Sequence, residues 1–413
     1  KQSTIAKGTE MSATALAGVR VVDFTWVWAG PFCTRQLADM GAEVIKIETE
    51  TRIDTVRREP PHKDDVFGIN RNATFSFYNR NKLGCSLNLK MPGAMDLLAE
   101  LISTSDAVVE NFTPRVLPSL GLDYESLKAI RPDIIMVSQS GFGGTGPYRD
   151  YVSYAEHPSN FSGLTSLSGL LDRPFGDQTA LSDQTVGLMG AFALLSALHH
   201  RAKTGEGQRI DVSQLESMVA FLPQGIMDYG LNQRIRERQG NRDDIMAPHG
   251  VYRCQGDDQW VSIAVATDEE WAAMANTAGH PEWATDERFS DALQRWSNQD
   301  ILDELVQGWT EQHDHHEVMH LLQAAGVAAI ASLTTAEFME DPHVQDRGFI
   351  VEVDHPEMGP HKLTGPPWKM SETPGHIKRA APQLGQDNEY VFGDLLGTPR
   401  ETLADLTERG VLH

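Results

Sequence analysis

Residues 17–50 read AGVRVVDFTWVWAGPFCTRQLADMGAEVIKIETE, and this stretch decides the fold of the chain. The sequence VVDF at Val21–Phe24 predicts a strand, and the pair Gly30-Pro31 ends a turn. Apolar residues then recur at helical spacing to about Met40, and the β-branched run at 44–47 predicts the next strand. A strand, a helix and a second strand in this order predict a βαβ unit within a parallel sheet.

Further along the chain, strands and helices continue to alternate. The predicted elements are a helix near Pro92–Ser103, a strand at Ala107–Glu110, a helix near Tyr124–Ile130 capped by Asp123, and strands at Ile134–Ser138 and Gln208–Val212. Strands that alternate with helices form a parallel sheet whose two faces are both covered. This part of the chain is therefore predicted to have an α/β fold.

One long helix is predicted over Leu181–Thr204, closed by Gly205 and by basic residues in its last turns. Its middle, VGLMGAFALLSAL, is apolar nearly all round, which predicts a core helix. Gly187 and Gly190 would let another part of the backbone come close. The apolar run is shorter than the ~20 residues that cross a bilayer, so no membrane span is expected.

The character of the sequence changes near Gly230. Residues 232–244 are polar and charged, as in a linker, and a smaller α+β segment follows with a strand at Trp260–Ala266. Thr267 and Glu270 match a helix capping box. The chain becomes rich in Pro and Gly after Gly348 and is expected to end in a short helix near Asn388–Leu396.

Composition narrows the class of protein. A chain of 413 residues exceeds the usual length of one domain and predicts two. A formal net charge of −23 would repel nucleic acid and anionic membranes, so neither is expected as a partner. Cys33, Cys85 and Cys254 are too widely spaced for metal or redox pairs, which predicts a reducing, cytoplasmic location. Residues 1–10 precede Met11 and are expected to be a leader outside the fold.

Two motifs suggest other functions, but the residues around each motif argue against that interpretation. Residues 141–146, GFGGTG, match a dinucleotide-binding fingerprint, but Pro147 and Tyr148 follow where the phosphate-binding helix should begin, which favours a flexible loop. His313, His315 and His316 suggest a metal site. Because no second ligand pair at helical spacing frames a carboxylate, a solvated helix end is the preferred interpretation and no metal is predicted.

Asp183 lies where the apolar helix begins. Ser182 or Asp183 would ordinarily be the N-cap of such a helix, because Ser and Asp are favoured there. A carboxylate at the end of an apolar helix is also partly desolvated, which makes it a stronger nucleophile, and nearby backbone N–H groups would steady its charge. The residues alone leave both interpretations open.

Several cationic residues lie within the otherwise apolar βαβ sequence. Taken singly, each is typical of a solvated surface. Taken together, and interleaved with Asn79, Asn81 and Asn111, they predict an anchor for a polyanionic ligand on an acidic protein. These cationic residues are Lys46, Arg80, Lys82, Lys90 and Arg115.

Seven segments, in order and spaced over nearly the whole chain from Gly18, resemble one family. They are residues 17–50, 79–90 (NRNKLGCSLNLK), 109–124 (VENFTPRVLPSLGLDY), 138–147 (SQSGFGGTGP), 181–215, 240–252 (GNRDDIMAPHGVY) and 341–360. The family is the class III CoA-transferases, the group that contains formyl-CoA transferase and carnitine CoA-transferase. The resemblance implies a Rossmann-like large domain formed by residues 11–228 and 348–413, a linker and smaller α+β domain at 229–347, and a homodimer of interlocked rings.

The resemblance also implies the chemistry. The catalytic aspartate of the family falls on Asp183, whose carboxylate would attack an acyl-CoA thioester and pass through a mixed anhydride to an aspartyl-CoA intermediate. N–H groups near Gly143 and Gly144 would stabilise the oxyanions. The substrates implied are coenzyme A, bound as an acyl-CoA, and a carboxylic acid. The segments that contact CoA map onto Trp26, Val27, Trp28, Ala29, Leu87, Lys90, Asn111 and Phe112.

The sequence departs from formyl-CoA transferase in three places. Thr49 stands where that enzyme has a phosphate-binding arginine, so Arg52 or Arg115 is expected to substitute. Trp26 and Trp28 replace a His and a Gln, which argues against an oxalate or formyl substrate. Residues 246–250, MAPHG, stand in place of its glycine-repeat loop.

Two alternative functions stay open. The related α-methylacyl-CoA racemases use a His and an Asp, and these positions fall on Tyr154 and Ala155, although Glu156 and His157 lie close by in the sequence. The other alternative is a protein that binds CoA esters without turnover. The residues Tyr154 and Ala155 favour the transferase over the racemase, and retention of Asp183 argues against a protein that only binds CoA esters.

Overall fold

The computed structural model describes residues 14–173 and 181–413, and the expected leader at residues 1–10 lies outside them. The described residues divide into two compact units. The first unit comprises residues 14–164, 181–227 and 345–413, and the second comprises 165–173 and 228–344. Each unit has its own hydrophobic core.

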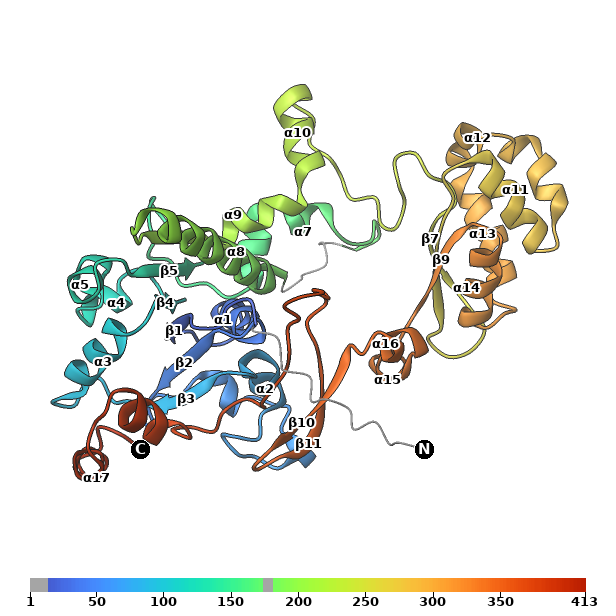
Figure 1. The fold of residues 1–413 in the computed structure, drawn as a ribbon. Helices are drawn as coiled ribbons and strands as arrows, with labels where there is room; N and C mark the ends of the chain where they lie inside the picture. Colours follow the sequence, from blue (N-terminus) through green and yellow to red (C-terminus); the bar gives the residue numbers. More distant parts are fainter. Residues whose placement is uncertain (1–13, 174–180) are drawn as a thin grey trace, which may run out of the picture. The chain divides into compact units, whose positions relative to one another are not determined.

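A six-stranded sheet forms the centre of the first unit, in the order β3-β2-β1-β4-β5-β6 (Figure 1). Every neighbouring pair in it is parallel, so the predicted α/β class with a parallel sheet is confirmed. The strand order is that of doubly wound Rossmann-type sheets, which bind ligands beyond the carboxyl ends of the strands where the order reverses. The strands are β1 (Arg20–Asp23), β2 (Glu43–Glu48), β3 (Leu83–Ser86), β4 (Ala107–Glu110), β5 (Ile135–Ser140) and β6 (Arg209–Ser213).

Neighbouring residues of each strand belong to opposite faces of this sheet. Val21 packs in the core with α1 and α8, whereas Val22 packs in the other core with α3, α5 and the C-terminal residues. This alternation follows from the two-residue period of a strand, so neighbouring apolar residues of β1 contribute to different cores. The helices of the two faces are α1 (Ala29–Asp39), α3 (Ala94–Ser103), α5 (Tyr124–Ile130) and α8 (Leu181–Thr204).

Helix α8 has the predicted bounds and lies along α1 on one face of the sheet (Figure 1). A Cβ on Gly187 would lie 2.8 Å from the carbonyl oxygen of Ala29, so the expected close approach is confirmed there. By length and composition α8 is also apolar enough to cross a membrane, but it contacts α1, β5 and β6 as a core helix does. One side of the helix is left uncovered within the chain, because Leu188, Met189, Phe192 and Leu195 are exposed.

The C-terminal segment adds to the core of the first unit. The predicted last helix is present as a π-helix over Glu389–Leu395, and its Phe392 is fully buried against the sheet. A further helix, α17 (Arg400–Glu408), follows it, so the expectation that the chain ends in the earlier helix is wrong. The strands β10 (Ile350–His355) and β11 (Gly359–Thr364) form an antiparallel hairpin.

Several shorter helices belong to the first unit or to the segments that connect it with the second unit. They are α2 (Ala73–Asn79), α4 (Val116–Ser119), α6 (Glu156–Ser162), α7 (Leu164–Leu167), α9 (Gln214–Met218) and α10 (Pro223–Asn232).

The second unit has the predicted α+β character. Its antiparallel sheet has the order β7-β8-β9, with β7 at His249–Arg253, β8 at Trp260–Ala264 and β9 at Ala328–Ser332. The predicted capping box of Thr267 and Glu270 is confirmed at the start of α11. The helices are α11 (Asp268–Thr277), α12 (Ala292–Ser297), α13 (Gln299–Thr310), α14 (His315–Ala324) and α15 (Thr335–Glu340), and α16 (Pro342–Asp346) leads back to the first unit.

Candidate active site

Asp183 lines a cavity of about 180 Å³ in the first unit, and only 9% of the residue is exposed. The cavity lies at the carboxyl ends of the strands, because its walls come from the segments that end or follow β1, β4, β5 and β6. Six of the residues predicted to contact CoA line it together with Asp183, namely Trp26, Val27, Trp28, Ala29, Asn111 and Phe112. The structure therefore brings the predicted nucleophile and most of the predicted ligand-binding residues to one place.

A glutamine that the sequence did not indicate holds the carboxylate of Asp183. The Nε2 of Gln214 donates to Asp183 Oδ1 at 2.6 Å and to Ser182 Oγ at 2.8 Å. The hydroxyl of Ser182 in turn donates to the backbone oxygen of Ala155. Helix α8 already includes Leu181, so Ser182 and Asp183 lie inside its first turn and the N-cap interpretation is wrong for both.

Burial raises the pKa of Asp183 from 3.8 to about 6. The hydrogen bond from Gln214 lowers the pKa, and the negative charge of Glu156 raises it further. A carboxylate that is stripped of water but still ionised at neutral pH is more reactive toward an electrophile than one in solution. Asp183 therefore has the protonation state and the environment of a nucleophile.

The loop between β1 and α1 forms one wall of the cavity, and buried polar groups hold it. The side chain of Asn111 accepts from the N–H of Trp26 at 2.8 Å and donates to its carbonyl oxygen at 2.9 Å. Val27 has a φ of +66°, which a β-branched side chain rarely adopts, and its N–H donates to Asp54 Oδ1 at 3.0 Å. Such strain persists only where the surroundings enforce it, and it is common beside ligands.

Aromatic rings fix the two tryptophans of this loop. Trp28 stacks on Tyr78 with ring centroids 5.8 Å apart, and Trp26 meets Phe112 edge to face at 5.5 Å. The guanidinium of Arg52 lies 5.5 Å from the ring of Trp26. Both indoles are half-buried and line the cavity, so an apolar part of a ligand would contact them.

Three buried polar atoms of the cavity wall have no hydrogen-bond partner among the described residues. They are Trp28 Nε1, Gln139 Oε1 and Ser140 Oγ. A buried polar group without a partner costs about 1–3 kcal/mol, so native proteins leave such groups mainly where a ligand or water satisfies them. This wall therefore suits a ligand that carries both donors and acceptors.

The structure does not bring the other predicted CoA-binding residues to the cavity. Leu87 is a buried core residue that pairs with Leu412, and Lys90 and Arg115 are exposed. Arg52 approaches the cavity only through its contact with Trp26. Roles for these four residues in binding CoA stay predictions.

Three of the cations expected to anchor a polyanion are instead buried in ion pairs. Lys46 pairs with Asp54 at 3.1 Å, Lys82 with Asp23 at 2.9 Å, and Arg80 with Asp39 at 2.6 Å. Because these side chains are excluded from solvent, their charges serve the interior of the fold. The prediction that they hold a ligand is wrong for all three.

The Gly-rich loop stands beside a second, smaller cavity of about 50 Å³. The N–H of Gly144 donates to both carboxylate oxygens of Asp211, at 2.8 and 2.9 Å. Gly143 has a φ of +82°, which explains the glycine at that position. Of this loop, Ser140 and Gly141 line the cavity of Asp183 and Gly143 and Gly144 do not, so the oxyanion role of the latter pair stays a prediction.

The positions that carry the base in a racemase lie at or near the cavity of Asp183. Tyr154 and Ala155 line the cavity of Asp183, but neither side chain abstracts a proton from carbon. His157 is exposed, lies outside the described lining of the cavity, and accepts from the N–H of Tyr154 at 2.9 Å. Among the described residues that line the cavity, Asp183 supplies a carboxylate without a paired histidine.

Known proteins resemble this chain over nearly its whole length. The family model described as "CoA-transferase family III" matches residues 16–388. The succinyl-CoA–D-citramalate CoA-transferase of Chloroflexus aurantiacus is 34% identical over 400 residues, which cover 96% of this chain and 98% of that protein. The beta subunit of the succinyl-CoA–L-malate CoA-transferase of the same organism is 35% identical over 410 residues, again covering 96% and 98%.

A solved structure extends the likeness to the fold. The crystal structure of a CAIB/BAIF family protein from Brucella suis superposes with a TM-score of 0.84 at 32% identity, covering 93% of this chain and all of that one. The family match, the relatives and the shared fold agree with the resemblance seen in the sequence. The chain belongs to CoA-transferase family III and is an enzyme of that family.

Proposed function

We propose that this enzyme moves CoA from an acyl-CoA thioester to a carboxylic acid, with Asp183 as the nucleophile. The observation that carries the proposal is the carboxylate of Asp183, held by Gln214 at 2.6 Å in a cavity whose wall contains unpaired polar atoms. The cavity of about 180 Å³ is smaller than the ~300–1,000 Å³ typical of sites that hold a whole ligand. It therefore suits the acyl end of the substrate.

The proposed reaction proceeds in four balanced steps. The carboxylate of Asp183 attacks the thioester carbonyl and expels the CoA thiolate, which leaves a mixed anhydride. The thiolate then attacks the aspartyl carbonyl and releases the donor acid as its carboxylate, forming an aspartyl-CoA thioester. The acceptor carboxylate attacks this thioester to give a second anhydride and free thiolate. Attack of the thiolate on the acceptor carbonyl yields the new CoA ester and restores Asp183.

Each step passes through a tetrahedral oxyanion that needs hydrogen-bond donors. For the N–H of Gly144 to serve, it would have to leave Asp211, so we infer that the loop 141–146 rearranges when substrate binds. The positive φ angles of Gly143 and Gly146 give this loop a backbone that only glycine adopts without strain.

We infer that the substrates are CoA esters and salts of small dicarboxylic acids. This inference rests on the relatives, whose names specify succinyl-CoA with D-citramalate or L-malate. The aromatic side chains of Trp26 and Trp28 in the cavity wall would contact the carbon chain of such an acyl group.

The decisive experiment incubates the protein with succinyl-CoA and, separately, D-citramalate, L-malate, glutarate and oxalate, and follows CoA esters by mass spectrometry. We expect exchange with at least one of the first three acids, and its loss in Asp183→Ala. Exchange that survives in Asp183→Ala would contradict the proposed nucleophile. Incorporation of deuterium at the α-carbon without exchange would support the racemase. If neither reaction is detected, the result would support a protein that only binds CoA esters.

We further infer that the protein is a cytoplasmic homodimer. The exposed side chains Leu188, Met189, Phe192 and Leu195 all belong to α8, and Phe192 is 71% exposed. An apolar face of this kind on a helix that is otherwise packed in a core is typical of a subunit interface. The interlocked arrangement implied by the family resemblance would cover it.

A further inference from the structure

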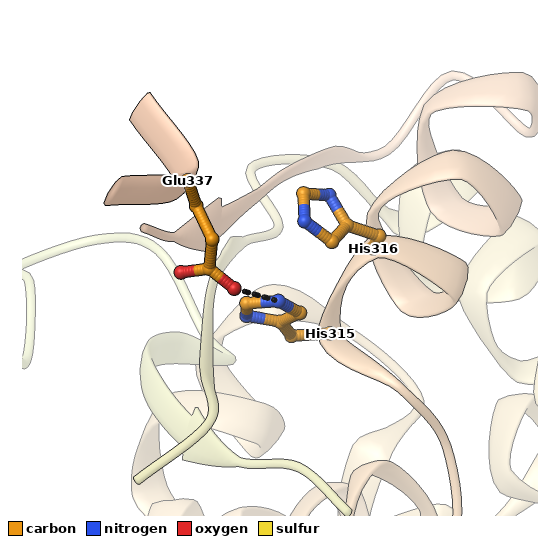
Figure 2. A group of neighbouring side chains, drawn as sticks. All are labelled: His315, His316 and Glu337. Atoms are coloured by element: carbon orange, nitrogen blue, oxygen red, sulfur yellow. Dashed lines mark ion pairs between the residues drawn. The ribbon is translucent and has the colours of Figure 1, made fainter. Parts of the chain in front are cut away.

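The second unit contains a cluster of two histidines and a glutamate that plays no part in the proposed reaction. His315 and His316 open α14, and Glu337 lies in α15 (Figure 2). One ligand atom of each residue lies within 4.8 Å of the other two. Figure 2 shows the carboxylate of Glu337 directed toward the ring of His315, with the ring of His316 nearby. Two separate helices thus bring three possible metal ligands together.

His315 is not a solvated residue at a helix end, as the sequence had suggested, because only 2% of it is exposed. Its Nε2 lies 3.6 Å from Glu337 Oε1, and its Nδ1 has no hydrogen-bond partner among the described residues. A separation of 3.6 Å exceeds the ~3.2 Å limit of a good hydrogen bond. It is close to the roughly 3.3 Å between two ligands that share a tetrahedral Zn²⁺ with bonds of ~2.0–2.1 Å.

Glu337 is held in place by contacts on its other side. Its Oε2 accepts from both the backbone N–H and the hydroxyl of Thr334, each at 2.7 Å, in the capping box of α15. Oε1 remains directed at His315. Outer contacts that orient a ligating carboxylate in this way are characteristic of metal sites.

The types of ligand decide which ion would fit. Two imidazoles and one carboxylate suit Zn²⁺ and its first-row neighbours, whereas Mg²⁺ and Ca²⁺ prefer sets of oxygen ligands. Because His316 and Glu337 are partly exposed, solvent reaches the cluster and water can complete the coordination. The net charge of −23 favours the approach of cations.

We propose that His315, His316 and Glu337 bind one divalent transition-metal ion of the zinc class. The ion joins the start of α14 to α15, the helix that precedes the return of the chain to the first unit. Its role is to stabilise the second unit, separately from the chemistry of Asp183. The sequence drew attention to the histidines but not to Glu337, because Glu337 comes from a different helix and shows no ligand spacing with them.

The test uses the full-length protein, stripped with a chelator and titrated with Zn²⁺ by calorimetry and with Co²⁺ by visible absorption. We expect one Zn²⁺ per chain, a Co²⁺ spectrum of tetrahedral or five-coordinate type, and no comparable binding of Mg²⁺. Glu337→Gln should weaken Zn²⁺ binding at least about tenfold. This variant keeps the capping box, because Gln serves at the same helix position, so it should fold normally.

The matched control is His320→Ala, which removes an exposed histidine one turn beyond His316 on the same helix. It should leave the Zn²⁺ affinity unchanged, while His316→Ala should weaken binding as Glu337→Gln does. Zn²⁺ should also raise the melting temperature of the wild type and have a much smaller effect on Glu337→Gln. The proposal is overturned if the wild type does not bind Zn²⁺, if Mg²⁺ binds equally well, or if His320→Ala weakens binding and Glu337→Gln does not.

Discussion

At the scale of single residues, the carboxyl group of Asp183 combines reactivity with a cost in stability. Because its pKa rises from 3.8 to about 6, its nucleophilic form is lost as the pH falls through 6. We expect kcat/KM for CoA transfer to fall about tenfold per pH unit below that value. A pH–rate profile with succinyl-CoA would show this, and a profile that stays flat down to pH 4.5 would contradict it.

The same raised pKa predicts how Asp183 affects folding. In the folded protein the buried carboxyl holds its proton up to about pH 6, whereas the unfolded chain releases it near 3.8, so ionisation opposes folding as the pH rises between these values. Asp183→Asn should therefore be more stable than the wild type at pH 8 by up to about 3 kcal/mol, and the difference should vanish near pH 4. Urea unfolding at both pH values measures it. An equal stability difference at pH 4 and pH 8 would assign the effect to packing.

Gln214 is a positioning residue, since it acts on Asp183 and its hydrogen bond lowers the pKa of the carboxyl group. Gln214→Leu removes that bond, so the acid limb of the kcat/KM profile should move to higher pH. The activity on the plateau at high pH should fall less than the activity on the acid limb. The matched control is Gln184→Leu, because Gln184 donates to the hydroxyl of Tyr78. An unmoved acid limb in Gln214→Leu would exclude the proposed role.

Sequence reasoning singled out Asp183 through its place in α8 and through the family resemblance, but it did not indicate its contact with Gln214. The contact between them joins residues that are 31 positions apart, and no local spacing indicates it. Gln214 does follow β6 directly, and residues at the carboxyl ends of parallel strands are where ligands bind, so strand position was an available signal. Lys46, Arg80 and Lys82 were wrongly predicted to bind a ligand. A sequence does not show which cationic residues will form ion pairs with buried carboxylates.

At the scale of elements, the predicted strands and the long helix α8 were confirmed because their patterns are local. Alternation places Val21 and Val22 on opposite faces, and the bounds of Leu181–Thr204 follow from its apolar run and its closing Gly205. Helix α17 was missed because its sequence, RETLADLTE, is mostly polar and contributes a single buried residue, Leu406. A helix with so narrow an apolar face gives only a weak periodic signal.

The packing of α8 on α1 gives a prediction at this scale. A Cβ on Gly187 would lie 2.8 Å from the carbonyl oxygen of Ala29, a backbone atom that cannot move without displacing the wall of the cavity. Gly187→Ala should destabilise the protein by about 1–3 kcal/mol and lower CoA transfer. Differential scanning fluorimetry and the exchange assay measure both effects.

The control for Gly187→Ala is Gly308→Ala in α13, where an added Cβ would meet no atom within 4 Å. Alanine is the better helix former, so this variant should match or exceed the wild type in stability by up to about 1 kcal/mol. If both variants lose stability equally, steric contact with Ala29 is not the cause.

At the scale of the whole molecule, composition and alternation predicted an α/β sheet and a second, α+β part, but they did not indicate that α8 would expose one side. The apolar run of α8 covers all of its faces, whereas one chain supplies partners for only some of them. A helix that is apolar all round requires burial all round. In the proposed homodimer, a second copy of the chain would cover the remaining face.

The exposed face of α8 predicts the assembly. Wild-type protein should sediment with twice the mass of a 45.7 kDa chain, and Phe192→Asp should reduce the dimer, because a charge at this 71% exposed position would have to be buried in the interface. Leu293→Asp is the control, since Leu293 is comparably exposed but lies on α12, outside the exposed face of α8. Circular dichroism checks that both variants fold. A wild-type chain that sediments as a monomer, or a Phe192→Asp variant that stays fully dimeric, would exclude this face as the interface, because burying an unpaired charge in an interface is strongly destabilising.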